Sequence, residues 1–265
     1  MINNTDTRPV GIFDSGLGGL CAVREAIKIL PGEDVVYFGD TGRVPYGSRS
    51  YDIIKRYARQ DMNFLIENNV KMILIACGTV ASVAIDYLKE IFPDIPIIGV
   101  VETACEKAVA IAGETQNKNI GVIGTEATIS KGMYKKYISE LDSGCEVYSK
   151  ACPLFVHLVE NGHINDDDMI TKSAVEYYLS EFKDLNLSSL ILGCTHYPMI
   201  KNIINGVVND KNGKTELIDV GLEAAYRLKQ ELTEKNLLND TDRKGALDIY
   251  ISDEPLNFSS ILINI

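Results

Sequence analysis

A chain of 265 residues, 46% of them hydrophobic and 24% charged, has a globular composition and is long enough for one large domain or two small ones, which excludes general disorder. Its 37 acidic residues exceed its 26 basic ones, and the formal net charge of −11 excludes a general electrostatic attraction to nucleic acid or an anionic membrane. An anionic ligand would therefore have to be held by local hydrogen-bond donors.

Residues 1–16 lack the basic and apolar regions of a secretory signal, and no stretch approaches the ~20 apolar residues that span a bilayer. We therefore expect a cytoplasmic protein whose six cysteines are thiols. No C-x-x-C pair is present and the three histidines are not spaced as zinc ligands, so we expect no metal site.

Apolar runs alternate with amphipathic segments along the chain. The apolar runs predict strands over residues 9–13, 34–38, 71–76, 95–100, 119–124, 145–150, 189–193 and 215–220. Several of these runs are β-branched and nearly continuous, as in parallel strands covered on both faces. Between them, the spacing of apolar residues predicts helices that include residues 22–30, 51–69, 81–92 and 166–182.

Three further segments have local signals. The aspartates at 166–168 indicate a helix N-terminus, where negative charge is favourable. Residues 207–216 (VVNDKNGKTE) are typical of a solvated turn. Residues 246–251 (ALDIYI) predict a last strand that completes or covers an earlier sheet.

A weak internal repeat divides the chain. KMILIACGTVAS (71–82) and SSLILGCTHYPM (188–199) each join an apolar strand to a cysteine, a threonine and a helix start, and Cys77 and Cys194 are 117 positions apart. GIFDSG (11–16) and GVIGTEAT (121–128) form a looser second pair. The alternation predicts an α/β fold with two pseudo-symmetric domains, each a mostly parallel sheet flanked by helices, with the active site in the cleft between them. We expect a first domain of residues 1–100 plus 215–265 and a second of residues 101–214.

The duplicated cysteine indicates acid–base chemistry. A thiol between a strand end and a helix start has its thiolate stabilised by the helix dipole. Two such thiols facing one carbon suit stereoinversion, because one removes a proton from one face and the other donates a proton to the opposite face. We interpret Cys21, Cys105 and Cys145 as small buried hydrophobic residues.

Polar groups accompany both cysteines. Asp14 and Ser15 end the first predicted strand in FDSGLGGL (13–20), whose glycine spacing fits neither a dinucleotide fingerprint nor a P-loop. Asp14 is compatible with a ligand contact and with a helix cap alike. His196 stands beside Cys194, which favours a role in proton handling.

Six motifs resemble, in order, those of bacterial glutamate racemases in the aspartate/glutamate racemase superfamily. They are FDSGLGGL, GDTGRVPYGSRS (39–50), ACGTVAS (76–82), GTEATISKGMY (124–134), ACPLFVHLVENG (151–162) and LILGCTHYP (190–198). The resemblance spans roughly residues 9 to 220. It implies glutamate racemisation without pyridoxal phosphate or metal, D-glutamate supplied to peptidoglycan synthesis, and a homodimer.

The resemblance also implies roles for individual residues. Cys77 and Cys194 would be the acid–base thiols, Asp14 and His196 would assist them, and Glu160 would lie close to the cleft. The residues implied to surround the substrate are Asp14, Ser15, Tyr46, Gly47, Gly78, Thr79, Thr125, Thr128, Thr195 and His196. Two positions depart from the family pattern. Gly78 replaces an asparagine, which leaves only a backbone N–H there. His157 replaces a proline, where it would reshape the cleft wall, add a titrating group or lie at the surface.

Other functions remain open on the sequence. An aspartate racemase or another amino-acid racemase of the superfamily would use the same pair of thiols. A non-catalytic two-domain binding protein would have no need for duplicated cysteines, and a cysteine hydrolase would leave the second thiol unexplained.

Overall fold

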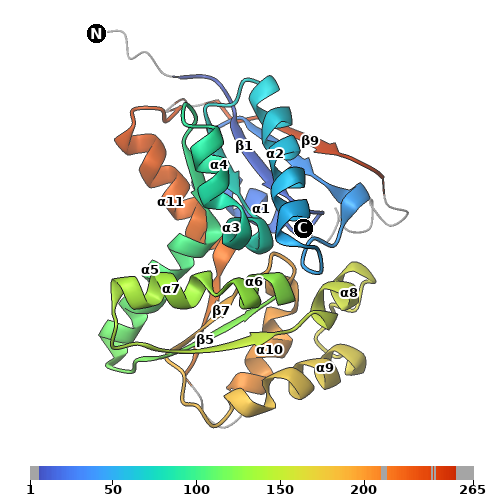
Figure 1. Cartoon of the computed structure of the whole chain (residues 1–265), viewed down its shortest axis with the longest axis vertical. Coiled ribbons are helices and arrows are strands. Elements are labelled where there is room, and N and C mark those ends of the chain that lie inside the picture. The colour runs from blue at the N-terminus through green and yellow to red at the C-terminus, as the bar shows by residue number, and fades with distance from the viewer. Residues whose placement is uncertain (1–5, 210–213, 240, 242, 255–265) are drawn as a thin grey trace. The chain divides into compact units, whose positions relative to one another are not determined.

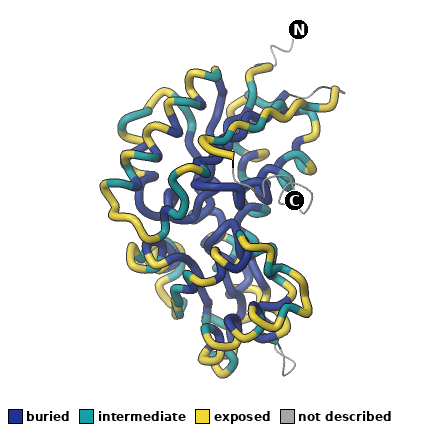
Figure 2. Tube along the Cα trace, turned by 90° about the vertical axis from the view of Figure 1, so that its right-hand side faces the viewer, coloured by how far each residue is buried: buried dark blue, intermediate teal, exposed yellow. Residues whose placement is uncertain are grey.

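The computed structural model describes residues 6–209, 214–239, 241 and 243–254, and it divides into two compact units. The first unit contains Met1–Val100 and Gly221–Ile265, and the second contains Val101–Val220. In both units most strands run through the buried interior, whereas the edge strands over residues 146–151 and 247–251 are partly exposed, and the helices turn exposed sides outward (Figure 2).

The first unit is a five-stranded sheet in the order β4-β3-β1-β2-β9, in which every pair is parallel. Its strands are β1 (Val10–Asp14), β2 (Val35–Gly39), β3 (Met72–Ile75), β4 (Ile97–Gly99) and β9 (Leu247–Ile251). Its helices are α1 (Leu20–Ile29), the short η1 (Thr41–Arg43), α2 (Tyr51–Glu67), α3 (Gly78–Val83), α4 (Ile85–Ile91) and α11 (Val220–Glu234). Figure 1 shows α2 and α4 in front of β1, so these helices cover one face of the sheet.

The second unit is a four-stranded parallel sheet in the order β6-β5-β7-β8. Its strands are β5 (Asn119–Gly124), β6 (Glu146–Ala151), β7 (Ser189–Leu192) and β8 (Glu216–Asp219). Its helices are α5 (Val100–Thr115), α6 (Glu126–Lys131), α7 (Met133–Leu141), α8 (Leu154–Glu160), α9 (Met169–Leu179), η2 (Ser180–Phe182), η3 (Tyr197–Ile200) and α10 (Lys201–Val208). In Figure 1, α6 and α7 lie on one side of the sheet and α9 and α10 on the other.

The internal repeat of the sequence is reproduced in the topology. The order β4-β3-β1-β2 of the first sheet matches the order β8-β7-β5-β6 of the second, strand for strand. In this correspondence β3 is equivalent to β7, so the two strands that precede Cys77 and Cys194 hold equivalent places. The two parallel-sheet domains flanked by helices are therefore those that the sequence predicted.

All nine predicted strands are present, but three other predictions need correction. Residues 215–220 were assigned to the first domain, whereas β8 pairs with β7 and belongs to the second sheet. The helix predicted over 81–92 is two helices that break at Ala84, and the first of them begins at Gly78 because burial of all its residues outweighs weak helix propensity. The predicted turn at 207–216 begins with the end of α10, and residues 210–213 lie outside the described residues.

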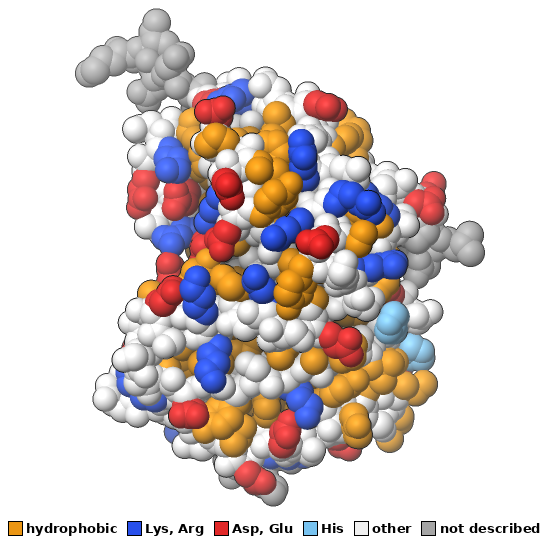
Figure 3. All heavy atoms as spheres, in the orientation of Figure 1, with side chains coloured by type: hydrophobic (Ala, Val, Ile, Leu, Met, Phe, Trp, Pro, Cys, Tyr) orange, Lys and Arg blue, Asp and Glu red, His pale blue; other side chains and the backbone are white. Residues whose placement is uncertain are grey.

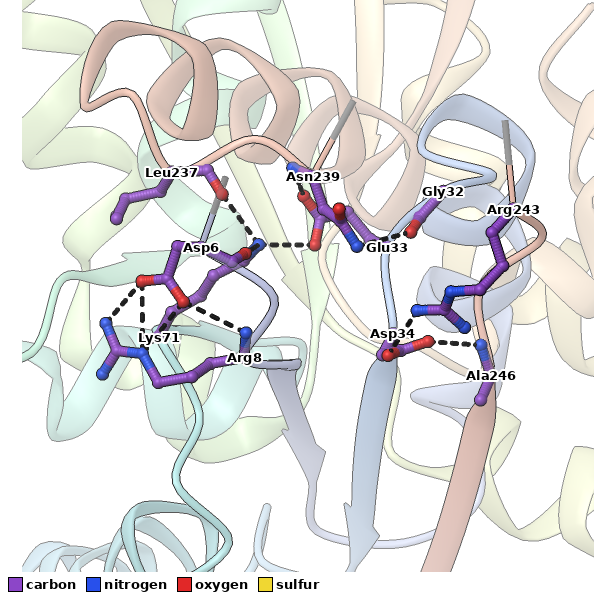
Figure 4. A network of polar contacts seen from close by, with 10 residues as sticks. All are labelled: Asp6, Arg8, Gly32, Glu33, Asp34, Lys71, Leu237, Asn239, Arg243 and Ala246. Carbon is purple, nitrogen blue, oxygen red and sulfur yellow. Dashed lines mark hydrogen bonds and ion pairs between the residues drawn. The ribbon is translucent and has the colours of Figure 1, made fainter. Parts of the chain in front are cut away.

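A buried ion pair joins four segments of the first unit that are distant in the sequence (Figure 4). The Lys71 Nζ lies 2.7 Å from Glu33 Oε2, and both side chains are almost fully buried. Lys71 Nζ also donates to the backbone carbonyls of Asp6 and Leu237, at 2.8 and 2.7 Å. The second carboxylate oxygen of Glu33 accepts a hydrogen bond from the Asn239 backbone N–H at 2.6 Å. The pair thereby fastens the chain on both sides of the excursion into the second unit.

Candidate active site

The carboxyl ends of β1, β2 and β3 bring one group of predicted site residues together in the first unit. Because these strands are parallel neighbours, the residues that follow them emerge at the same edge of the sheet. β1 leads into Asp14 and Ser15, Cys77 follows β3, and the segment after β2 carries Tyr46. All four side chains are buried.

Asp14 is held by the glycine-rich turn that follows it. Its Oδ2 accepts hydrogen bonds from the backbone N–H groups of Gly19 at 3.0 Å and Gly16 at 3.3 Å. A Cβ on residue 19 would stand 2.4 Å from the Asp14 Cβ, so this approach requires glycine. From β2, the buried Tyr37 hydroxyl donates to the Gly16 carbonyl at 2.6 Å. The carboxylate therefore orders the turn before α1, whose N-cap is Gly19, so Asp14 is fixed at the strand end without being the cap residue itself.

Cys77 is the N-cap of α3, which confirms its predicted place between a strand and a helix. Its Sγ lies 3.3 Å from Ser15 Oγ as a hydrogen-bond donor, so the ends of β3 and β1 are in contact through these side chains. Gly78 and Thr79 form the first turn of α3, and both are buried. One thiol, one hydroxyl and one oriented carboxylate thus share this sheet edge.

The Tyr46 hydroxyl is already engaged. It is hydrogen bonded to Asp40, and it lies 3.0 Å from Asp61 Oδ2. The following residue, Gly47, is partly exposed. What this segment can offer a ligand is therefore its backbone and the tyrosine ring, rather than the phenol oxygen.

In the second unit, the residues after β7 form a thiol–imidazole–carboxylate chain. Cys194 Sγ lies 3.6 Å from His196 Nδ1, and His196 Nε2 lies 3.2 Å from Oε1 of Glu160, the last residue of α8. Burial disfavours a charged ring, but the hydrogen bonds to Cys194 and Glu160 outweigh it and raise the pKa of His196 well above its usual value. The arrangement therefore favours an imidazolium between the Cys194 sulfur and a carboxylate, which can exchange a proton at that sulfur.

The threonines of the second unit have different surroundings. Thr195 lies between the thiol and the imidazole in the sequence and is buried. Thr125 is the N-cap of α6, where its Oγ1 accepts the Thr128 N–H at 3.3 Å and lies 3.0 Å from the Thr128 hydroxyl. These two hydroxyls serve the start of α6, which follows the strand next to β7.

The surroundings of Cys194 differ from the prediction in one respect. No helix starts directly after it, because the turn η3 intervenes and α10 begins only at Lys201. Gly193, just before the cysteine, donates to the Ile123 carbonyl at 2.8 Å, and a Cβ there would stand 2.6 Å from that oxygen. The group next to the Cys194 sulfur that can stabilise its charge is thus His196 rather than a helix end.

The remaining cysteines are consistent with structural roles. Cys21 and Cys105 are buried, as predicted, whereas Cys145 is only half-buried because it leads into the edge strand β6. Cys152 is fully buried, and burial raises the pKa of its thiol to about 12.

His157 is exposed on α8, which favours its interpretation as a surface residue over a role in reshaping the site.

Sequence reasoning missed a cluster next to Tyr46. Asp40 and Asp61 are both fully buried, and Arg43 forms ion pairs with each of them. A signal was present, because Asp61 interrupts the buried stripe of α2 formed by Ile54, Ala58, Met62 and Leu65. An acidic residue on the apolar face of a helix requires buried partners.

The described part of the chain has no group of three or more His, Cys, Asp or Glu side chains arranged for a metal ion. No helix within that part is long and apolar enough to cross a membrane. On the face drawn in Figure 3, basic and acidic side chains are interspersed.

Comparisons with known proteins agree on one relationship. Residues 25–227 match the profile of the Asp/Glu/hydantoin racemase family. A glutamate racemase of Sulfurihydrogenibium sp. (strain YO3AOP1) is 42% identical over 254 residues, which are 96% of this chain and 92% of that protein. A glutamate racemase of Chlorobaculum tepidum is 40% identical over 96% of this chain and 90% of that protein.

A solved structure matches over a similar length. The glutamate racemase of Francisella tularensis, in complex with D-glutamate, is 40% identical with a TM-score of 0.88, and the match covers 97% of this chain and 92% of that chain.

Proposed function

Because the chain belongs to the glutamate racemases of the Asp/Glu/hydantoin racemase family, we propose that it interconverts L- and D-glutamate by transferring protons through Cys77 and Cys194. The observation that carries the proposal is the duplicated strand-end thiol. Each cysteine follows an equivalent strand of a repeated sheet, and each contacts a polar side chain suited to proton chemistry. A binding protein has no need for such a pair, and a hydrolase needs one thiol only.

In the proposed reaction, one sulfur acts as base and the other as acid. A thiolate removes the α-proton, so that an S–H bond forms and the C–H electron pair stays on the α-carbon. The opposite thiol then donates its proton to the other face of that carbon and becomes a thiolate, which leaves the enzyme poised for the reverse direction. Following the family, Cys77 deprotonates the D-enantiomer and Cys194 the L-enantiomer. Asp14 assists the first thiol, and His196 with Glu160 assists the second.

The substrate carboxylates require neutral donors, because the chain is acidic overall. We assign this role to the hydroxyls of Ser15, Thr79 and Thr195 and to nearby backbone N–H groups, including that of Gly78. Further contacts come from Tyr46 and Gly47 in the first unit and from Thr125 and Thr128 in the second. Support for these roles is the position of the residues at strand ends and their match to the family motifs.

The cellular setting follows from the family resemblance. We propose that the protein acts in the cytoplasm as a homodimer, uses no cofactor, and supplies D-glutamate for peptidoglycan synthesis.

The test uses one enantiomer of glutamate in deuterated water. The product enantiomer should carry deuterium at the α-carbon, and the C77S and C194S variants should each lose nearly all turnover in both directions. C145S, which alters a half-buried thiol outside both sites, is the matched control and should keep full activity. Full activity in either site variant, or a product without solvent deuterium, would reject the thiol pair. Parallel assays with aspartate decide whether the substrate is glutamate.

A further inference from the structure

Two buried carboxyl groups share one tyrosine hydroxyl in the first unit. Asp40 follows β2 and Asp61 lies on α2, and neither side chain has any exposed surface. The Tyr46 hydroxyl is hydrogen bonded to Oδ2 of Asp40 and lies 3.0 Å from Oδ2 of Asp61. Arg43 places its Nε 2.6 Å from Asp40 Oδ2 and its Nη2 3.0 Å from Asp61 Oδ1. The four side chains join the segment after β2 to the helix that follows it.

If both carboxyl groups are ionised, the cluster has too few hydrogen atoms to place one between the Tyr46 oxygen and each carboxylate. A tyrosine hydroxyl has one hydrogen, which it can donate to one carboxylate only. A second carboxylate oxygen 3.0 Å from the same phenol oxygen, without a hydrogen between them, would be a buried repulsive contact. A proton on Asp61 removes the conflict. Asp61 then donates to Tyr46, Tyr46 donates to Asp40, and the charge of Asp40 is balanced by Arg43.

The partners of each carboxyl group indicate which one holds the proton. Oδ2 of Asp40 accepts both the Arg43 Nε–H and the Tyr46 hydroxyl, so this oxygen has no place for a hydrogen of its own. Asp61 accepts from Arg43 through Oδ1, which leaves Oδ2 to carry a hydrogen. Burial, and after it the charge of Asp40, raises the pKa of Asp61 to about 8. Asp61 is therefore a neutral acid at pH 7.

Few other ionisable groups face Asp61. The carboxylate of Asp14, on β1, acts in the same direction as Asp40, while Arg43 opposes both. Neighbouring α3 has no ionisable side chain, and Tyr87 of α4 faces Lys55 elsewhere on α2. On α2 itself, the uncharged Gln60 accepts a hydrogen bond from Arg43.

We propose that Asp61 is a positioning residue, which as a neutral acid holds the segment Asp40–Gly47 against α2 through the Tyr46 hydroxyl, and that loss of its proton weakens the binding of an anionic substrate. The inference rests on the proposed function, which makes this segment a glutamate contact. An ionised Asp61 would repel Asp40, loosen the segment and add a negative charge close to where a dicarboxylate must bind.

D61N is the decisive variant, because an asparagine amide donates to Tyr46 and accepts from Arg43 as the neutral acid does. For the unaltered protein, the KM for glutamate should rise several-fold between about pH 6.5 and about pH 9.5, centred near the pKa of Asp61. Near neutral pH, the KM and kcat of D61N should equal those of the unaltered protein. At higher pH, the KM of D61N should lack the part of the rise that is due to Asp61. The titrations of the thiols and of the substrate are common to both proteins and cancel in the comparison. D52N removes an exposed carboxylate from the same helix and should retain the full rise.

D61A removes the contact with Tyr46 altogether. It should raise the KM several-fold even at neutral pH, with a smaller effect on kcat.

Two measurements report on the proton without any turnover. Infrared spectra of protein with ¹³C-labelled aspartate should show a buried carboxylic-acid band at pH 7 that D61N lacks.

The pH dependence of stability gives the second readout. Because the folded pKa of Asp61 lies above its ordinary value of 3.8, the folded state binds more protons between about pH 4 and about pH 8, and stability must fall across that range. D61N should lack this fall, so its melting temperature should exceed that of the unaltered protein at pH 8.

The outcomes separate this inference from the proposed function. If glutamate is not racemised, the infrared band and the stability profile still decide whether Asp61 is protonated. If glutamate is racemised but the band is absent, or if D61N shows the same pH dependence of KM as the unaltered protein, the role of Asp61 is wrong. A D61N variant that loses kcat at unchanged KM would likewise overturn it.

Discussion

At the scale of single residues, the two strand-end thiols differ in what lies beside their sulfur atoms. Cys77 contacts the neutral Ser15 hydroxyl and caps a short helix. Cys194 contacts His196, whose ring is held by Glu160 and whose pKa is raised well above its ordinary value despite burial. A charged ring next to the sulfur stabilises its thiolate electrostatically. We therefore expect the reactivity of Cys194 to depend on the imidazolium of His196.

The H196Q variant tests this dependence. Removing the imidazolium should slow alkylation of Cys194 by iodoacetamide at pH 7 by about tenfold or more, because a hydrogen bond to a charged group contributes ~1.5–3 kcal/mol. Peptide mass spectrometry measures the rate, and Cys77 in the other unit provides the control within the same sample. Equal Cys194 rates in both proteins would contradict the role given to His196.

At the scale of elements, strands were easier to predict than helix ends. The central strands are short apolar runs that helices cover, so composition alone marks them, whereas the edge strands β6 and β9 are partly exposed. Helix ends depend on caps that are visible in the sequence in some places and hidden in others. Asp168 was visible, and it does cap α9 by accepting the N–H groups of Ile170 and Thr171. The helix start at Gly78 and the break at Ala84 were hidden, because the apolar spacing predicted one helix over residues 81–92.

Asp168 makes a prediction for α9. The D168A variant should lower the melting temperature because two N–H groups of the first turn lose their acceptor, and the exposed neighbour gives the control D167A, which should change little. The hydrogen bond from Thr171, and then that of His163, lower the pKa of Asp168. For a lowered pKa the stabilisation is present above the ordinary value and is lost as the pH falls through the folded one. The difference between D168A and the unaltered protein should therefore narrow below about pH 4. A constant difference down to pH 2 would show that the charge has no part in the cap.

The candidate site was predictable only in part, because some of its contacts depend on tertiary packing that the local sequence does not show. Strand-end residues such as Asp14, Cys77 and Cys194 follow from the rule that ligands bind at the carboxyl ends of parallel strands. The link from Glu160 to His196 joins the ends of two distant elements, and only the resemblance pointed to Glu160. Asp61 is 21 positions beyond Asp40 and has no motif of its own, so tertiary packing alone reveals the pair.

At the scale of the whole molecule, the repeated strand order places the two cysteines after equivalent strands, one in each sheet. The neighbours of the two thiols nevertheless differ, with Ser15 beside Cys77 and His196 beside Cys194. The second unit is continuous, whereas the first is interrupted and must recover its last helix and strand after the chain returns. The returning segment pairs β9 with β2, at the outer edge of the first sheet. That edge contact alone would leave the connection from α11 to β9 weakly held, so the buried pair of Lys71 and Glu33 has a structural purpose.

K71M should therefore destabilise the first unit selectively. Removing one partner of a buried ion pair leaves an uncompensated charge, here Glu33, and costs about 3–5 kcal/mol. Hydrogen exchange followed by mass spectrometry should show faster exchange in peptides covering β3 and β9 and little change in those covering β7. K28M, which breaks an ion pair in which Lys28 is 60% exposed, should cost less than about 0.5 kcal/mol. Adding E33Q to K71M should restore part of the loss, because it removes the stranded charge. Uniformly faster exchange in both units, or none in either, would mean that this pair does not fasten the returning chain.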